Sequence, residues 1–257
     1  VPQLLKRSED TAQGRFVVLK DKTGFADNLI QSLKAKGVEV VEIEEGSGFE
    51  RKGEKEIHID HTEESYCKLF EFLGTKASLN IVHCFSIEGS GGNSIQDLER
   101  RMGKGAFSLF SLTKALASNK IDERVNIFVV SDYANDITGL EDEIKPHNAS
   151  LMGLGKVIPQ ENMKIWVKCI DIDRNTHCEN ICSEIMNDMG GSQVGYRNNV
   201  RYRPEFRKIS IGGKNEKKMT FLKEGVYLIT GGLGGIGLEI AKLISQKANT
   251  ALCLVNR

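Results

Sequence analysis

The sequence has no excess of charge of either sign and no long apolar run. Its 257 residues include 35 Lys and Arg and 35 Asp and Glu, so the formal net charge is zero. This balance argues against a nucleic acid or an anionic membrane as the main partner. No apolar run approaches the roughly 20 residues that a bilayer-spanning helix needs. The opening VPQLLKRSEDTAQGRF also lacks the apolar core of a signal peptide. We therefore predict a protein with no nucleic-acid or membrane partner.

The chain lacks a Cys-x-x-Cys pair, although it contains six cysteines. Three of them lie inside apolar, strand-like runs: Cys84, Cys169 and Cys253. A free cysteine in such a run behaves as a small hydrophobic residue. The segment HCENIC places His177, Cys178 and Cys182 close together, but a zinc site would need a fourth ligand that the nearby sequence does not offer. We predict structural cysteines, no metal site and a reducing, cytoplasmic compartment.

From Arg15 to Met189 the sequence alternates between strand-like and helix-like segments. Apolar residues at helical spacing indicate the helices, and short β-rich or apolar runs indicate the strands. The expected strands span residues 15–21, 38–43, 54–60, 79–86, 124–131 and 164–173. The expected helices span residues 25–37, 62–74, 94–118, 177–189 and a short segment near 148–158. The alternation predicts an α/β fold with a Rossmann-like, doubly wound parallel sheet.

The alternating pattern ends in a hairpin and a polar segment, and then starts again. SQVGYRNNVRYRPEF is typical of a β-hairpin that turns at Asn198 and Asn199. The Lys-rich SIGGKNEKKMTFLKEG that follows is typical of a linker. We divide the chain into an N-terminal linker (1–14), a first Rossmann-like unit (15–208), a linker (209–223) and the first β-α-β of a second Rossmann unit (224–257). Because the sequence has no initiator Met, we expect it to be part of a longer chain.

The second unit opens with a glycine-rich loop between a strand and a helix. Gly232, Gly234 and Gly237 form G-x-G-x-x-G after the strand VYLIT and before the helix LEIAKLI. Glycines in this position let main-chain N–H groups approach a diphosphate at a helix N-terminus. The residues predicted to bind a dinucleotide here are Thr230, Gly231, Gly232, Leu233, Gly234, Gly235, Ile236 and Gly237. The alternative is a turn whose glycines serve only close packing of helix on strand.

Arg257 is a further candidate for cofactor binding. It lies twenty residues after Gly237, directly after the strand TALCLVN, where this fingerprint expects the side chain that contacts the ribose. A carboxylate there would accept a hydrogen bond from a free 2′-hydroxyl, whereas a guanidinium suits a 2′-phosphate. The residue therefore predicts NADP rather than NAD. The alternative is a solvated arginine without a ligand.

The first unit has no comparable loop. Its first turn, KDKTGFADN, contains only Gly24, and Lys22 and Thr23 are its candidates for contact with an anion. The segment EGSGGNS, residues 88–94, follows a strand and precedes a helix, but its spacing matches no phosphate motif, and we interpret it as a mobile loop. We expect a dinucleotide fold that binds no dinucleotide.

This pairing resembles the ketoreductase domain of modular polyketide synthases, a two-part member of the short-chain dehydrogenase/reductase superfamily. TGGLGGIG, residues 230–237, matches every fixed position of the family motif T-G-G-x-G-G-x-G. KPHNASLMGLGKVIPQEN followed by CIDID is similar to the stretch of the family that precedes a strand ending in Asp. VGYRNNVRYRPEF is similar to the hairpin that closes the family's first subdomain, in which a Tyr–Arg pair introduces the turn. The resemblance covers almost the whole chain from Arg15.

The resemblance implies a division of labour between the two units. The first would be a truncated structural subdomain that binds no cofactor. The second would begin a catalytic subdomain that transfers hydride from NADPH to a β-ketoacyl group on the phosphopantetheine arm of an acyl carrier protein. The remainder of that subdomain and the neighbouring synthase domains are the other implied partners.

The catalytic residues of the family lie downstream of the glycine loop: a Tyr that donates a proton, with a Ser and a Lys or Asn. None of the tyrosines present fits Tyr-x-x-x-Lys or Tyr-x-x-x-Asn: Tyr66, Tyr133, Tyr196, Tyr202 and Tyr227. We therefore predict no complete active site in this sequence, which is interpreted as part of a β-ketoacyl reductase. A non-catalytic pseudo-ketoreductase that holds neighbouring domains, and an unrelated NADP-dependent dehydrogenase with an accessory domain, are the alternatives.

Overall fold

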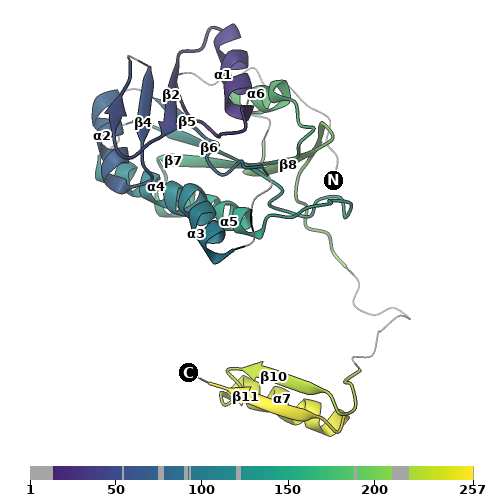
Figure 1. The fold of residues 1–257 in the computed structure, drawn as a ribbon. Helices are drawn as coiled ribbons and strands as arrows, with labels where there is room; N and C mark the ends of the chain where they lie inside the picture. The colour runs from purple at the N-terminus through teal and green to yellow at the C-terminus, as the bar shows by residue number, and fades with distance from the viewer. Residues whose placement is uncertain are drawn as a thin grey trace. The chain divides into compact units, whose positions relative to one another are not determined.

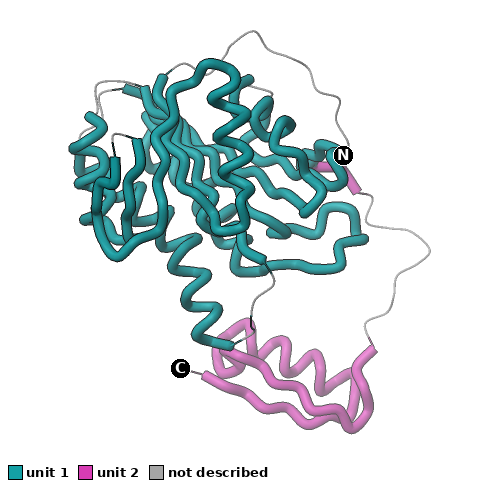
Figure 2. Tube along the Cα trace, turned by 45° about the horizontal axis from the view of Figure 1, so that its top comes forward, with its two compact units in different colours: residues 1–205 teal, residues 206–257 magenta. Residues whose placement is uncertain are grey.

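The computed structural model describes residues 14–53, 55–74, 78–89, 92, 94–119, 123–187, 190–209 and 220–256. The chain forms two compact units, residues 1–205 and 206–257, which are shown in different colours in Figure 2. Most of the two expected linkers, as well as Arg257, lies outside the described residues.

The first unit is built on a nine-stranded sheet in the order β3-β4-β2-β1-β5-β6-β7-β8-β9. Its strands are β1 (Arg15–Leu19), β2 (Val40–Glu45), β3 (Glu50–Arg51), β4 (Glu56–Ile59), β5 (Leu79–His83), β6 (Val125–Asp132), β7 (Ile165–Ile172), β8 (Gln193–Arg197) and β9 (Val200–Tyr202). All neighbours from β4 to β8 in this order pair in parallel, and only β3 and β9 at the two edges are antiparallel. The predicted doubly wound parallel sheet is confirmed, and β3 is a strand that the sequence did not indicate.

Helices cover both faces of this sheet (Figure 1). They are α1 (Phe25–Ala35), α2 (Glu63–Leu73), α3 (Ile95–Met102), the π-helical turn η1 (Gly103–Phe107), α4 (Ser108–Ser118), α5 (Pro146–Glu161) and α6 (Cys178–Met186). Side chains of β1 alternate between the faces: Phe16 and Val18 pack with α1 and α6, whereas Val17 and Leu19 pack with α2, α4 and α5. Because both faces are covered, the strands read as nearly continuous apolar runs.

The order of the strands creates a switch point between β1 and β5. The chain moves outward from β1 to β2 and β4, returns to β5 beside β1, and then moves outward in the other direction to β6, β7 and β8. Loops that follow β1 and β5 therefore diverge to opposite faces. In open α/β sheets this is the place where ligands bind.

Two predicted helices differ from the structure. The segment 94–118 was expected to be one helix, but its middle part, η1, is a π-helical turn that contains Gly103 and Gly105. A Cβ at Gly105 would lie only 3.1 Å from the side chain of Leu151 on α5. Helix α5 is longer than the expected short segment and runs for 16 residues from Pro146. Proline is favourable in the first turn of a helix. Glycine weakens a helix, but Gly155 lets α5 approach β7 so closely that a Cβ there would overlap the sulfur of Cys169.

The expected hairpin and the expected β-α-β are both present. Asn198 and Asn199 have φ of 50° and 65°, as a two-residue turn between β8 and β9 requires. In the second unit β10 (Val226–Thr230) pairs in parallel with β11 (Ala251–Val255), and α7 (Gly235–Lys247) connects them. In the part of the chain that the structure describes, no helix has the length and apolar character of a membrane span.

Candidate functional site

The glycine loop forms a junction between β10 and α7. Strand β10 ends at Thr230, four turn residues follow, and α7 begins at Gly235. Gly231 has a φ of 70°, which favours glycine. The N–H of Gly234 donates to the carbonyl oxygen of Gly231 at 3.0 Å, so the loop is a compact turn. The structure thus brings together all the predicted cofactor-binding residues from Thr230 to Gly237.

The positions of this loop require glycine for different physical reasons. A Cβ at Gly232 would lie 2.7 Å from the carbonyl oxygen of Ile229, and one at Gly237 would overlap the carbonyl group of Gly231. Packing within the loop therefore explains these two glycines. At Gly235, by contrast, nothing lies within 4 Å of the position of a Cβ. Packing alone does not account for Gly235, which borders open space at the start of α7.

The start of α7 offers main-chain donors. The first N–H groups of a helix have no partner within it, and among the described residues no side chain accepts a hydrogen bond from those at the start of α7. The positive end of the helix dipole lies at the same place and favours an anion. The side chains of Leu233 and Ile236 are 57% and 80% exposed beside the loop. The arrangement fits the diphosphate of a dinucleotide.

The end of β11 lies next to the glycine loop. The N–H of Gly232 donates to the carbonyl oxygen of Val255, the last residue of β11, at 3.0 Å. Because β10 and β11 are parallel, their carboxyl ends meet at the same edge. Arg257 itself lies outside the described residues, so its proposed role is still a prediction.

The first unit has a cavity of about 480 Å³ at its switch point, lined by residues that follow β1, β2 and β5. Ion pairs cross it: Lys22 and Lys104 lie 2.6 and 2.7 Å from Glu45, and Arg100 lies 2.5 Å from Glu88. Burial alone would raise the pKa of Glu45, but the ammonium groups of Lys104 and Lys22 outweigh it and lower the pKa to about 2. The candidate anion contact Lys22 is thus engaged with a carboxylate.

A second cavity, of about 580 Å³, lies beside the β8–β9 hairpin. Arg197 lines it and binds two carboxylates, Glu141 at 3.0 Å and Asp171 at 3.2 Å. Asp171 also accepts hydrogen bonds from the main-chain N–H groups of Ala134 and Asn135. Arg197 therefore fastens the loop after β6 to the sheet, whereas the hydroxyl of Tyr196, the other residue of the Tyr–Arg pair, donates to Glu184 on α6 at 2.7 Å.

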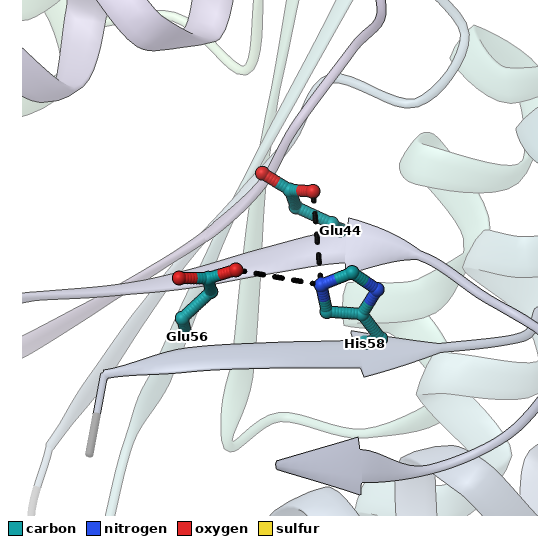
Figure 3. Close-up of side chains that lie close together, drawn as sticks. All are labelled: Glu44, Glu56 and His58. Atoms are coloured by element: carbon teal, nitrogen blue, oxygen red, sulfur yellow. Dashed lines mark ion pairs between the residues drawn. The ribbon is translucent and has the colours of Figure 1, made fainter. Parts of the chain in front are cut away.

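One group of side chains has the donor types of a metal site (Figure 3). The Nε2 atom of His58 on β4 lies 3.5 Å from Glu56 and 3.8 Å from Glu44 on β2. Glu44 also binds the ammonium of Lys20 at 2.8 Å. Glu56 is exposed, and Lys20 supplies a cation already, so ion pairing accounts for this arrangement.

The cysteines of HCENIC are engaged in packing. The thiol of Cys178 lies 3.6 Å from the carbonyl oxygen of Phe25, to which it donates, and Cys182 is buried between α6 and α1. Burial raises the pKa of Cys178 to about 11 and also raises the pKa of Cys182. Both thiols are therefore protonated at neutral pH and are poor metal ligands.

A buried polar group around Ser108 is a feature that the sequence patterns do not indicate. Its hydroxyl lies 3.1 Å from Nε2 of His83 and 2.7 Å from the hydroxyl of Tyr66. A serine beside a histidine has the form of an activated nucleophile. Both residues are fully buried, however, and burial lowers the pKa of His83 to about 3, so the imidazole is neutral in the core. The group links α2, α4 and β5.

Comparisons with known proteins show the family and the fold of the chain. A sequence model of the family described as beta-ketoacyl synthase-like, N-terminal, matches residues 14–188. Polyketide synthase PksN of Bacillus subtilis is 33% identical over 109 residues, which are 42% of this chain and 2% of that synthase. A 6-methylsalicylic acid synthase of Arthrobotrys oligospora is 32% identical over 123 residues, 46% of this chain and 7% of that synthase. The chain thus spans less than a tenth of the length of these relatives.

Solved structures share the fold. A structure of the adenylation, ketoreductase and pseudo Asub domains of a keto acid-selecting NRPS module matches 100% of this chain and 22% of its own, with a TM-score of 0.88 and 25% identity. An N-terminal ketoreductase from the macrolactin assembly line matches 97% of this chain and 50% of its own, with a TM-score of 0.77 and 19% identity. The chain belongs to the beta-ketoacyl synthase-like, N-terminal family, and it has the fold of the ketoreductase domains of modular polyketide synthases.

Proposed function

We propose that this chain is the structural subdomain of a β-ketoacyl reductase together with the first β-α-β unit of its catalytic subdomain. The intact domain would reduce a β-ketoacyl thioester on an acyl carrier protein to the β-hydroxyacyl form with NADPH. The observation that carries the proposal is the β10–α7 junction, where uncapped N–H groups and an unobstructed Gly235 lie at a helix start. The polyketide synthases among the relatives support the class of reaction.

In this proposal the second unit anchors the cofactor. The N–H groups of Gly235, Ile236 and Gly237 would donate to phosphate oxygens, and the dipole of α7 would favour their charge. When bound, NADPH supplies the hydride. The loop would fix one end of the dinucleotide so that the rest of the catalytic subdomain can orient the nicotinamide against the ketone.

Arg257 would select NADPH over NADH. The carboxyl end of β11 lies against the glycine loop through the Gly232–Val255 hydrogen bond, and this supports the placement of the next residues near the ribose. A guanidinium there would form charge-assisted hydrogen bonds with the 2′-phosphate.

The second unit would combine with further protein. Its two strands leave apolar side chains exposed: Val226, Leu228 and Val255. A parallel sheet is normally covered on both faces, so these residues support the remainder of the catalytic subdomain as a partner. The acyl carrier protein, the neighbouring synthase domains and a cytoplasmic location complete the proposal.

A second candidate is a reductase within a keto acid-selecting NRPS module. The match to such a module, at 25% identity over the whole chain, favours it. In that case the substrate would be a thioester of a keto acid that such a module selects, for which a 2-ketoacyl thioester serves as the test compound. A third candidate, a pseudo-ketoreductase scaffold, would reduce neither thioester, and because an inert domain can keep the glycine loop, cofactor binding separates it only partly from an enzyme.

One assay separates these candidates. The full-length protein is incubated with a β-ketoacyl thioester or a 2-ketoacyl thioester, each with NADPH or NADH, and the loss of reduced cofactor is followed. Faster consumption of NADPH with the β-ketoacyl thioester is expected. Faster turnover of the 2-ketoacyl thioester would favour the NRPS-type reductase, and no turnover of either would favour the scaffold.

A further inference from the structure

The first unit has its own strand–turn–helix junction at the switch point, and a carboxylate fills it. Asp21 follows β1 by two residues, and Gly24 with a φ of 88° precedes α1. The Oδ1 atom of Asp21 accepts a hydrogen bond from the N–H of Ala26 at 2.7 Å. Its Oδ2 atom accepts from the N–H groups of Thr23 at 2.7 Å and Phe25 at 3.3 Å, and from the Thr23 hydroxyl.

These contacts use the donors that a phosphate would use. Phe25 and Ala26 are the first two residues of α1, so their N–H groups have no partner within the helix. Asp21 is only 7% exposed, and its two oxygens accept from the N–H groups of both residues. At the equivalent place in the second unit, α7 follows Gly234 and no described side chain caps it. The two junctions therefore differ in whether the chain itself supplies the anion.

In the first unit, the acidic residue at the position of the ribose-binding acid is also paired within the unit itself. Glu45 ends β2 about twenty residues after Gly24, where a dinucleotide fold places the acid that binds the ribose. Lys22 and Lys104 lie 2.6 and 2.7 Å from Glu45, and Nε2 of His61 lies 3.3 Å from it. A nucleotide in the 480 Å³ cavity would have to compete with these partners.

We propose that Asp21 is the residue that excludes nucleotides from the first unit, because its carboxylate occupies the anion position at the switch point. A diphosphate approaching α1 meets a buried negative charge in place of free N–H groups. Burial in a medium of low dielectric constant strengthens this repulsion relative to water. The inference concerns the first unit and does not depend on whether the second unit binds NADPH.

The test counts anion sites. Inorganic pyrophosphate is titrated into the full-length wild type and the Asp21→Ala variant, and binding is followed by calorimetry. Asp21→Ala is expected to show one more saturable site than the wild type. Loss of the cap is expected to lower the Tm of the variant by roughly 2–4 °C, and binding of pyrophosphate is expected to restore it. Any site at the α7 loop is present in both proteins and cancels in the comparison.

Asp60→Ala is the matched control, since Asp60 accepts hydrogen bonds from the N–H and hydroxyl of Thr62 at the start of α2, away from the switch point. It is expected to add no site. If Asp21→Ala does not fold, Asp21→Ser, whose shorter uncharged side chain has one acceptor oxygen and leaves part of the anion position empty, is expected to add the site instead. The same number of sites in the Asp21 variants as in the wild type would overturn the proposal, as would an added site in Asp60→Ala.

Discussion

The N–H of Gly232 donates to the carbonyl oxygen of Val255 at 3.0 Å, so the glycine loop is fastened to the end of the neighbouring strand. This hydrogen bond couples the loop to the last residue of β11. The glycine loop and the carboxyl end of β11 therefore lie together at one edge of the β10–β11 pair.

Replacing Arg257 with glutamate is expected to weaken NADPH more than NADH. The change removes charge-assisted hydrogen bonds to a 2′-phosphate and introduces repulsion, for a loss of roughly tenfold to hundredfold in NADPH affinity. Equilibrium titration of the full-length protein with each cofactor measures both values. An equal loss for NADPH and NADH would refute the role of Arg257.

Replacing Gly237 with alanine is expected to loosen the second unit. The new Cβ would overlap the carbonyl group of Gly231, at a cost of about 1–3 kcal/mol. Hydrogen exchange of the amides in β10 and β11 should become faster. Gly235→Ala is the matched control: its Cβ meets nothing within 4 Å, and alanine favours the helix, so exchange should be unchanged or slower.

Replacing Glu184 with glutamine is expected to destabilise the first unit strongly. The buried carboxylate lies 2.5 Å from Lys168 and 2.7 Å from Arg201, and it accepts a hydrogen bond from Tyr196 at 2.7 Å. Its loss removes the carboxylate that pairs with the fully buried Lys168 and with Arg201, and breaking a buried ion pair costs about 3–5 kcal/mol. Chemical unfolding measures the change, with Glu63→Gln in an exposed pair with Lys114 as the control. A loss as small as that of the control would contradict this account.

The stability of the first unit is expected to fall in acid partly through Glu45. Its folded-state pKa of about 2 is below the ordinary value of 4.5, so its contribution is present above pH 4.5 and is lost as the pH falls towards 2. Glu45→Gln should flatten the dependence of Tm on pH in this window. Glu71→Gln, on the exposed side of α2, is the control and should keep the slope of the wild type. An unchanged slope in Glu45→Gln would show that the ion pairs with Lys22 and Lys104 do not stabilise the fold.

Local patterns were enough to predict most of the fold. The apolar runs around Val17 and Val82 indicated strands covered on both faces, and two consecutive asparagines indicated the hairpin turn. The glycine loop was also recognised from its spacing. The sequence does not show which of its glycines are required by packing and which border open space, because this depends on how closely β10 and α7 approach one another.

Features that depend on distant contacts were missed. Helix α5 contains Gly153, Gly155 and Pro159, which favour a short helix, yet it runs for 16 residues and packs closely on β7 at Gly155. The cap formed by Asp21 was missed because KDKTG has no spacing that signals a phosphate mimic. The strand β3 has only two residues and no apolar pattern of its own.

The most direct test of the account is the affinity of the full-length protein for NADPH, measured by titration for the wild type and for Gly235→Val. The account predicts saturable binding by the wild type, and at least a hundredfold weaker binding by the variant with unchanged hydrogen exchange in β10 and β11. Equal affinity of the two proteins for NADPH would contradict the assignment of the Thr230–Gly237 loop as the cofactor anchor.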